Sequence, residues 1–357
     1  MKNILRQNIN TLICCIVTLI LAAFTIYAVL KGSGISLNEL IADLRDASLW
    51  GLIPASIGAL GFIWFEGEAL RVIVRHMGYP TKRTQGFVYA AADVYFSAIT
   101  PSASGGQPAS AFFMMQDKIP GTAVMTALLL NLIMYTLAII TIGIADILLF
   151  PGIFLNFNLF CRILIIAGGL ILTGLGILFY LLLKRQSLIL AAGRGITGLL
   201  RRLHCSRLAD RIERKLASSI TKYSQCVSVV FNGKKMLRKV YLLNLCQRLS
   251  QIIVTLFSFR AIHGDLRRLP HLLATQIYVV LGSNCVPIPG GMGVTDYLML
   301  NGYCRLMTRD EAFRLEILSR GLSFYICIIV SLIAVIAGYI IPVSYTHLRA
   351  HETELHL

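Results

Sequence analysis

The sequence predicts an all-α polytopic membrane protein with about seven or eight membrane segments, two of them broken, re-entrant hairpins. Three observations support this. Hydrophobic residues make up 56% of the 357-residue chain and charged residues only 14%, whereas soluble domains are about one-quarter charged. Apolar runs recur that are long enough, or nearly so, to cross a hydrocarbon core of about 30 Å. Two further apolar regions are interrupted by proline and paired glycines.

The first apolar segment, residues 9–30, follows Lys2 and Arg6. A secretory signal is one interpretation of this pattern. No small-residue cleavage site precedes Lys31-Gly32, so a retained spanning helix is the better prediction. The remaining predicted segments are 49–65, 121–150, 159–183, 237–259, 272–288 and 317–342.

The largest polar stretch, residues 184–239, contains fourteen Lys or Arg residues against Asp210 and Glu213. Because basic loops stay in the cytoplasm, this loop and the basic N-terminus are predicted to be cytoplasmic. Its interspersed leucines and isoleucines favour amphipathic helices lying on anionic headgroups. A nucleic-acid patch is less favoured because the run lacks interleaved aromatic residues.

Residues 87–116 are apolar, but counting crossings shows that they cannot form a single span. The basic segment 66–86 suits the cytoplasm, and helix 121–150 must leave from that side if 159–183 returns to the basic loop. Residues 87–116 therefore enter and come back, turning at the stretch TPSASGGQP, Thr100 to Pro108. A cytoplasmic loop between two half-buried helices is the alternative.

A second interruption, GSNCVPIPGGMGVTD at residues 282–296, follows the apolar run 272–281. The crossing count brings this hairpin in from the opposite face, although loop 260–271, with Arg260, Arg267 and Arg268, is basic for an outside loop. Two broken segments entering from opposite faces are typical of an inverted repeat with a binding site near the midplane. Broken backbone within lipid survives only where protein encloses it or where it lines a wet cavity.

Three stretches carry a family resemblance: DVYFSAITPSASGGQPA (93–109), IPGTAVMTALLLN (119–131) and NCVPIPGGMGVTDY (284–297). They resemble the lysylphosphatidylglycerol synthase transmembrane family, the flippase-like membrane domain of the multiple peptide resistance factor. The resemblance covers roughly residues 10–342 and implies a flippase-like domain over 1–342 in the cell membrane.

The resemblance implies a protein that moves or binds an anionic or aminoacylated phospholipid. Members of this family also carry a cytosolic domain that makes the lipid from an aminoacyl-tRNA, and we expect no room for that domain after residue 342. A phosphatidylglycerol lysyltransferase or another lipid-modifying transferase is the first alternative function. A membrane scaffold subunit is the second.

A lipid headgroup inside a membrane needs polar backbone, hydroxyls, amides and a fixed charge. Asp93 is the first candidate, because a carboxylate in an apolar segment is rare; it would meet an ammonium group, or else pair with Arg71 or Arg75. Gly105 and Gly106 would expose amides to a phosphate. The remaining substrate-binding candidates are Ser97, Thr100, Ser102, Ser104 and Gln107 in the first hairpin, and Asn284, Pro289, Gly290, Gly291, Gly293 and Asp296 in the second.

Several of these residues also have purely structural interpretations. The hydroxyls can cap helix ends, and Asp296 can cap a helix over 297–304. Arg248 and Arg320 could bind a phosphate but are expected to snorkel to the interface. Glu66 and Glu68 follow Trp64 and Phe65, which suggests interface anchoring. Asp146 is expected to face water, and Asn131 and Tyr135 to bond a neighbouring helix.

No catalytic motif is found: the chain contains no GxSxG and no P-loop, and His351-Glu352 followed by His356 is not HExxH. The nine cysteines lack CxxC or zinc-ligand spacing. We therefore predict no metal, no cofactor and no nucleic-acid partner. The expected partners are membrane phospholipids, namely phosphatidylglycerol or its aminoacylated form, and oligomerisation is left open. The tail VSYTHLRAHETELHL, residues 343–357, fits no membrane pattern and is predicted to be non-native, with a genuine cytosolic tail as the alternative.

Overall fold

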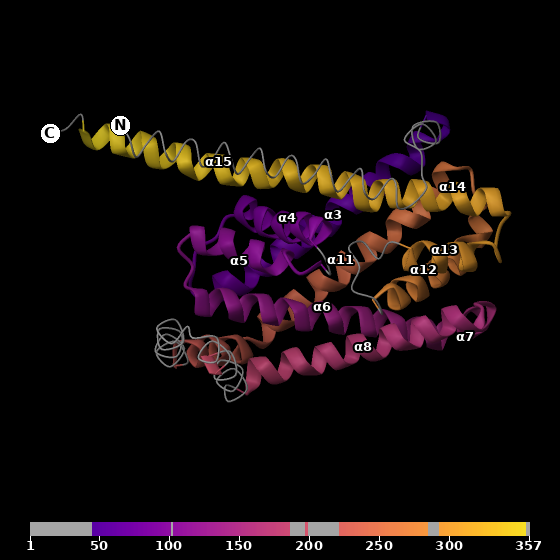
Figure 1. The fold of residues 1–357 in the computed structure, drawn as a ribbon, viewed down its shortest axis with the longest axis horizontal. Helices are drawn as coiled ribbons and strands as arrows, with labels where there is room; N and C mark the ends of the chain where they lie inside the picture. The colour runs from indigo at the N-terminus through magenta and orange to yellow at the C-terminus, as the bar shows by residue number, and fades with distance from the viewer. Residues whose placement is uncertain (1–44, 101–102, 186–196, 199–220, 285–292, 355–357) are drawn as a thin grey trace.

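The computed structural model describes residues 45–100, 103–185, 197–198, 221–284 and 293–354, and within these ranges all regular structure is helical (Figure 1). The predicted all-α class is confirmed. The expected helix 9–30 and most of the basic loop, residues 186–196 and 199–220, lie outside the described residues.

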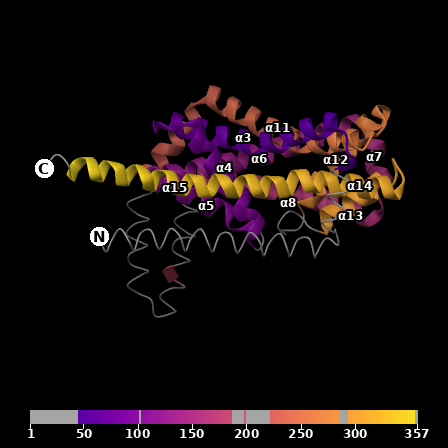
Figure 2. The same cartoon turned by 90° about the horizontal axis from the view of Figure 1, so that it is seen from above.

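Five helical segments of the described residues are long and apolar enough to cross a membrane. They run roughly along the longest axis of the molecule, and α3 and α11 lie side by side (Figures 1 and 2). The last segment is continuous through a short π-helical turn, η4 (Gly321–Ile326). The five are α3 (Leu49–His76), α6 (Gly121–Leu149), α8 (Leu159–Lys184), α11 (Lys234–Ala261), and the run Arg309–Ile340 formed by α14 (Arg309–Arg320), η4 and the start of α15 (Cys327–Glu354).

Three predicted boundaries are wrong because helices continue through polar residues. Helix α3 runs to His76 rather than ending near residue 65, and inside it Arg71 pairs with Glu68 one turn away. The last span begins at Arg309 instead of 317, and α15 continues to Glu354, past the end of the apolar pattern at 342. Residues 221–232 are helical, in agreement with the helices expected within the basic stretch, and α11 begins at Lys234, three residues before the predicted 237.

The first broken hairpin consists of α4 (Arg83–Ile99) and α5 (Gly106–Gln116). Helix α4 crosses α3 where Gly67 faces Gly86, and a Cβ at Gly86 would lie 2.6 Å from the carbonyl oxygen of Gly67. Small residues at a helix crossing let two backbones approach closely. This contact holds α4 against α3 along its length.

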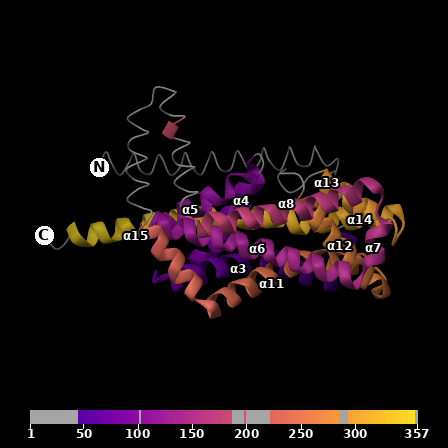
Figure 3. The ribbon, with the colours of Figure 1, turned by 90° about the horizontal axis from the view of Figure 1, so that it is seen from below.

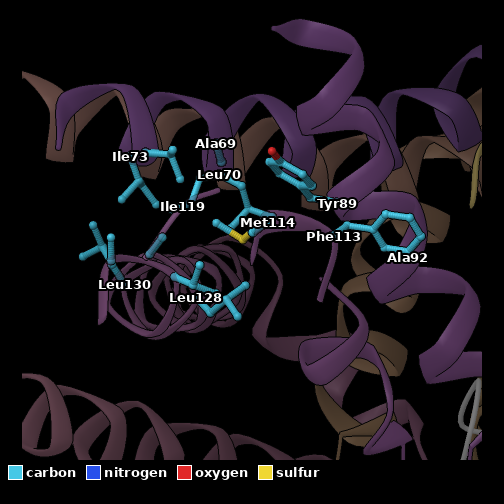
Figure 4. Close-up of a cluster of buried hydrophobic side chains, with 14 of the residues drawn as sticks. Ala69, Leu70, Ile73, Tyr89, Ala92, Phe113, Met114, Ile119, Leu128 and Leu130 are labelled. Atoms are coloured by element: carbon cyan, nitrogen blue, oxygen red, sulfur yellow. The ribbon is translucent and has the colours of Figure 1, made fainter. Parts of the chain in front are cut away.

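The apolar face of this hairpin packs against two of the spanning helices (Figure 4). Met114 of α5 lies between Leu70 and Ile73 of α3 and the side chains of α6. Tyr89 of α4 is fully buried beside them, and its hydroxyl donates a hydrogen bond of 2.5 Å to Asp117. One face of the hairpin is therefore buried against the bundle, while Phe112 and Met115 on the other face of α5 are exposed.

The second broken hairpin consists of α12 (Leu269–Ser283) and α13 (Val294–Tyr303). The 3₁₀ turn η2 (Leu266–Arg268) joins it to α11, and the short α7 (Pro151–Asn156) lies beside its start. Helix α12 ends five residues before the predicted limit of 288. Near that end, Leu281 fills the space left by Gly143 of α6 and Gly168 of α8.

The two hairpins open toward opposite ends of the bundle (Figures 1 and 3). At one end His76, the last residue of α3, lies 3.3 Å from the Val229 carbonyl just before α11, and α4 begins seven residues after His76. At the other end the amide of Ser48 donates to the carbonyl of Ala261, the last residue of α11, and α12 follows. This arrangement of the described helices is the one expected for two opposed hairpins, and their re-entry into a membrane from opposite faces stays a prediction.

The Gly67–Gly86 crossing gives the first testable prediction. Gly86→Ala should lower the free energy of unfolding by about 1–3 kcal/mol, because the added methyl forces the α3 and α4 backbones apart. Thermal unfolding of the purified protein in detergent measures the change. Gly174→Ala in α8 is the matched control: its Cβ meets nothing within 4 Å, so helix propensity should stabilise the protein by up to about 1 kcal/mol. Equal shifts in the two variants would contradict the tight crossing.

Candidate functional site

The turn of the first hairpin satisfies its own backbone. Thr100 ends α4, donating from Oγ1 to the carbonyl of Phe96 and accepting from the amide of Gly105 at 2.9 Å. Ala103 takes a left-handed conformation, with φ at 52°. Thr100 and the Gly105 amide thus shape the turn, as the capping interpretation expected, and Ser104 is exposed beside them. Ser102 lies outside the described residues.

Asp93 faces the start of α5 rather than an arginine. Its carboxylate accepts a 2.7 Å hydrogen bond from Gln107 Nε2, and Ser97 Oγ lies 3.3 Å away. A Cβ at Gly106 would overlap both Asp93 Oδ1 and Ser97 Oγ. Only glycine therefore lets the first turn of α5 close against Asp93. The expected alternative pairing with Arg71 is wrong, since Arg71 binds Glu68.

Glu66 of α3 completes an acidic pair with Asp93. The two carboxyl groups lie close enough to act on each other. Glu66 is only 6% exposed, and Gln247 of α11 donates to its Oε2 at 2.9 Å. The interface role predicted for Glu66 is wrong. Helix α3 continues past this residue, and α4 and α11 cover its side chain. The sequence around Glu66 gives no sign that this carboxylate is buried, because a carboxylate directly after Trp64 and Phe65 is also what an exposed interface position would show.

Arg248 lies beside this pair, near the middle of α11. It is 5% exposed, and its guanidinium carbon is 3.9 Å from the ring centroid of Tyr135 and 5.0 Å from that of Phe62. Its Nη1 donates to Gln251 at 2.7 Å, and Glu66 is the acidic group that attracts it. The predicted snorkelling is therefore wrong: two aromatic faces hold the cation inside the bundle.

The guanidinium also borders a small apolar pocket between α6, α11 and α12. All its other lining residues are aliphatic, and two of them, Val280 and Leu281, belong to the end of α12 in the second hairpin. Arg248 thus lies between the acidic pair of the first hairpin and the tip of the second. The pocket-lining residues are Ile139, Ile142, Arg248, Ile252, Ile277, Val280 and Leu281.

Two other predictions about α6 have opposite outcomes. Asn131 accepts a 3.0 Å hydrogen bond from Asn244 of α11, and Tyr135 stacks on Arg248, so the expected contacts with a neighbouring helix are confirmed. Asp146 was expected to face water but is buried, because the second hairpin covers the end of α6.

The second hairpin carries a comparable group of charges. Asp296 caps α13 by accepting from the amide of Gly293, whose φ is 77°, and its other oxygen lies 2.9 Å from Arg320 Nε. The carboxyl group of Glu316, which is 4% exposed, lies close enough to Asp296 for the two to act on each other. The predicted N-cap role over 297–304 is wrong in position: α13 begins at Val294 with Gly293 as N-cap, and Asp296 lies in the first turn and bonds back to the Gly293 amide. The expected snorkelling of Arg320 is wrong.

The remaining candidates of the second hairpin do not gather at this group. Asn284 ends α12 and donates to the carbonyl of Val280 at 2.6 Å, so it serves as a helix cap. Gly293 supplies the left-handed turn before α13. Pro289, Gly290 and Gly291 lie outside the described residues.

The arrangement can bind a zwitterionic or charged group. The first cluster is defined here as Glu66, Asp93, Gln107, Gln247 and Arg248, which supply two carboxyls, two amides and a guanidinium. Glu66, Gln247 and Arg248 are buried, and Asp93 and Gln107 are half-buried. Charges at such depth are costly and are retained where they pair or bind a ligand. Sequence reasoning identified Asp93 and Gln107, noted Arg248 as a possible phosphate ligand, and missed Glu66 and Gln247.

The contact at Gly106 gives the second prediction. Gly106→Ala should destabilise the protein by about 1–3 kcal/mol, because its methyl displaces Asp93 and Ser97. In a background carrying Asp93→Ala and Ser97→Ala the same substitution should cost less, with a coupling of about 0.5–3 kcal/mol. Thermal unfolding of the four proteins in detergent closes this cycle. Strict additivity would show that Gly106 does not press on these side chains.

The chain was compared with known proteins. No curated protein sequence matches it. The sequence model of the family described as "Lysylphosphatidylglycerol synthase TM region" matches residues 12–331, which include all the elements of both hairpins and the first cluster. The chain is therefore a polytopic membrane protein that belongs to the lysylphosphatidylglycerol synthase transmembrane family.

Proposed function

We propose that this protein moves an anionic or aminoacylated phospholipid, of the lysylphosphatidylglycerol type, between the two leaflets of the cell membrane. The observation that carries the proposal is the first cluster: both signs of charge lie buried where a broken hairpin meets the middle of α6 and α11. A translocated headgroup needs such a polar station, because hydrocarbon penalises its charges while tolerating its acyl chains.

The chemistry of the cluster matches both parts of such a headgroup. The guanidinium of Arg248 suits a phosphate, since arginine binds phosphate with charge-assisted hydrogen bonds. The carboxyls of Glu66 and Asp93 suit an ammonium group. Arg248 Nε has no hydrogen-bond partner among the described residues, which leaves it a donor for a ligand.

Aliphatic side chains of α6, α11 and α12 border the guanidinium of Arg248 and would lie next to a bound phosphate. The pocket that they line is only water-sized, so a bound headgroup would have to widen it. Because the two hairpins open toward opposite ends of the bundle, the lipid could reach the site from either face of the membrane. Alternation between the two faces around a fixed midplane site is how broken-helix transporters work.

We also propose that the end of the bundle bearing the first hairpin faces the cytoplasm. The described residues near that end include Arg75, Lys82, Arg83, Lys118 and Lys184, and α11 begins there with further basic residues. Positive charge is retained on the cytoplasmic side. The N-terminus and the basic stretch 184–239 would then lie in the cytoplasm, close to anionic headgroups.

The third prediction tests transport directly. Full-length protein reconstituted into vesicles should carry lysylphosphatidylglycerol from the inner to the outer leaflet, where a membrane-impermeant amine reagent detects it. Because the assay contains no aminoacyl-tRNA, any signal is transport and not synthesis. Asp93→Asn and Arg248→Gln should each lower the rate at least about tenfold, the effect of losing about 1.4 kcal/mol of headgroup binding.

Matched controls come from the exposed start of α14. Asp310→Asn and Arg309→Gln make the same chemical changes at surface positions and should leave the rate unchanged. Folding of each variant is checked by its thermal unfolding. Wild-type vesicles that exchange lipid no faster than protein-free vesicles, or cluster variants that match the wild type, would contradict the proposal.

A further inference from the structure

Each broken hairpin presents one aspartate to a glutamate on an adjoining long helix, with an arginine beside the pair. In the first hairpin Asp93 of α4 meets Glu66 of α3, and Arg248 of α11 attracts Glu66. In the second, Asp296 of α13 meets Glu316 of α14, and Arg320 binds Asp296. The same trio of side-chain types thus occurs at both hairpins, which open toward opposite ends of the bundle.

Two ionised carboxylates that lie close together offer only acceptors and repel each other, whereas one proton shared between them converts the repulsion into a hydrogen bond. We infer that each pair holds one such proton. With that proton, an Asp–Glu–Arg trio carries one negative and one positive charge and is neutral. Without it, the trio carries one uncompensated negative charge inside the bundle, which is costly unless a cation replaces the proton.

The first pair has unused capacity to accept hydrogen bonds. Gln107 Nε2 donates to Asp93 and Gln247 Nε2 donates to Glu66, but neither amide oxygen has a partner among the described residues. Gln247 is 1% exposed, so its Oε1 is a buried acceptor next to the acidic pair. Two carboxyls and two free amide oxygens match an ammonium group, which offers three donors and no acceptor.

Among the residues that the structure describes, the other groups packed around Glu66 and Asp93 supply no cation that could replace the shared proton. The charged groups acting on Glu66 are Asp93 and Arg248, and Arg248 is directed to Tyr135, Phe62 and Gln251. Helix α5 and the part of α15 facing α4, up to Ile340, contain no Asp, Glu, Lys, Arg or His. Glu68, nearby on α3, is paired with Arg71.

We propose that the Glu66–Asp93 pair exchanges its shared proton for the ammonium group of a cationic lipid headgroup, so that binding of the lipid releases one proton. This inference rests on the proposed function and adds its coupling: the site stays neutral only if a proton leaves as the cation arrives. The corresponding pair, Asp296 and Glu316, gives the same exchange at the opposite hairpin. A proton gradient would then drive the cationic lipid across.

The fourth prediction is the proton release itself. Purified full-length protein in weakly buffered detergent at about pH 5.5, where the amines of lysylphosphatidylglycerol stay protonated, is mixed with this lipid and a pH-indicator dye. About one proton per bound lipid should appear, and phosphatidylglycerol, which has no ammonium, should release none. Lysine ethyl ester, which has the ammonium groups but no acyl chains, tests whether an ammonium alone is enough to release the proton. Binding is counted in parallel by native mass spectrometry.

Glu66→Gln should bind the lipid more weakly and lose the release, because the amide keeps the shape of the side chain but has no acidic proton to exchange; protons are therefore counted per lipid bound. Glu68→Gln, two residues away on the same helix, is the matched control and should release the proton normally. If Glu66→Gln fails to fold, the wild type alone decides: its affinity for lysylphosphatidylglycerol should strengthen by about tenfold per pH unit while the pair holds its proton.

The outcomes separate the two proposals. Lysylphosphatidylglycerol that binds without proton release, or with an affinity independent of pH, overturns the exchange and leaves the transport proposal intact. A protein that binds neither phospholipid overturns the proposed function itself. Release that persists in Glu66→Gln at the wild-type amount also overturns the assignment to this pair.

Discussion

The enclosure of Arg248 is the interaction on which the rest of the structure depends. A guanidinium near the middle of a spanning helix is tolerated only if other groups replace water around it, and here Tyr135, Phe62, Gln251 and Glu66 do so. These residues come from α6, α3 and α11, so the cation fixes how three long helices pack. The same contacts bring a positive charge next to the acidic pair of the first hairpin.

The broken hairpins are the second constraint. A helix can end inside a membrane only where its backbone is satisfied and covered by protein. Thr100 and Asp296 accept backbone amides at the two breaks, Asn284 bonds a carbonyl, and Gly67, Gly86 and Gly168 allow neighbouring helices to cover the arms. Once the breaks are stable, Asp93 and Asp296 can meet the glutamates of α3 and α14. Polar side chains then reach depths that an unbroken apolar helix would exclude.

Much of this architecture follows from the sequence. Proline and paired glycines mark where a helix breaks, and counting the crossings indicates from which side each broken segment enters. They predicted two opposed hairpins, and the rarity of carboxylates in apolar segments identified Asp93. Glu66 and Arg248 were misjudged because each lies near polar residues that suggest an interface. Their burial depends on which neighbour crosses them, and α3 meets α4 and α11 at points that hydropathy does not encode. Gly106 was chosen for its amide, whereas its role in the structure is to leave room for Asp93.

The central claim is that a lipid headgroup binds at Arg248 and the Glu66–Asp93 pair. The most direct measurement is electron cryo-microscopy of the protein in nanodiscs containing lysylphosphatidylglycerol. The account predicts headgroup density within the bundle, with the phosphate at the guanidinium and an amine at the carboxyls. Lipid density confined to the outer surface of the bundle, with the cluster closed around its own side chains, would contradict it.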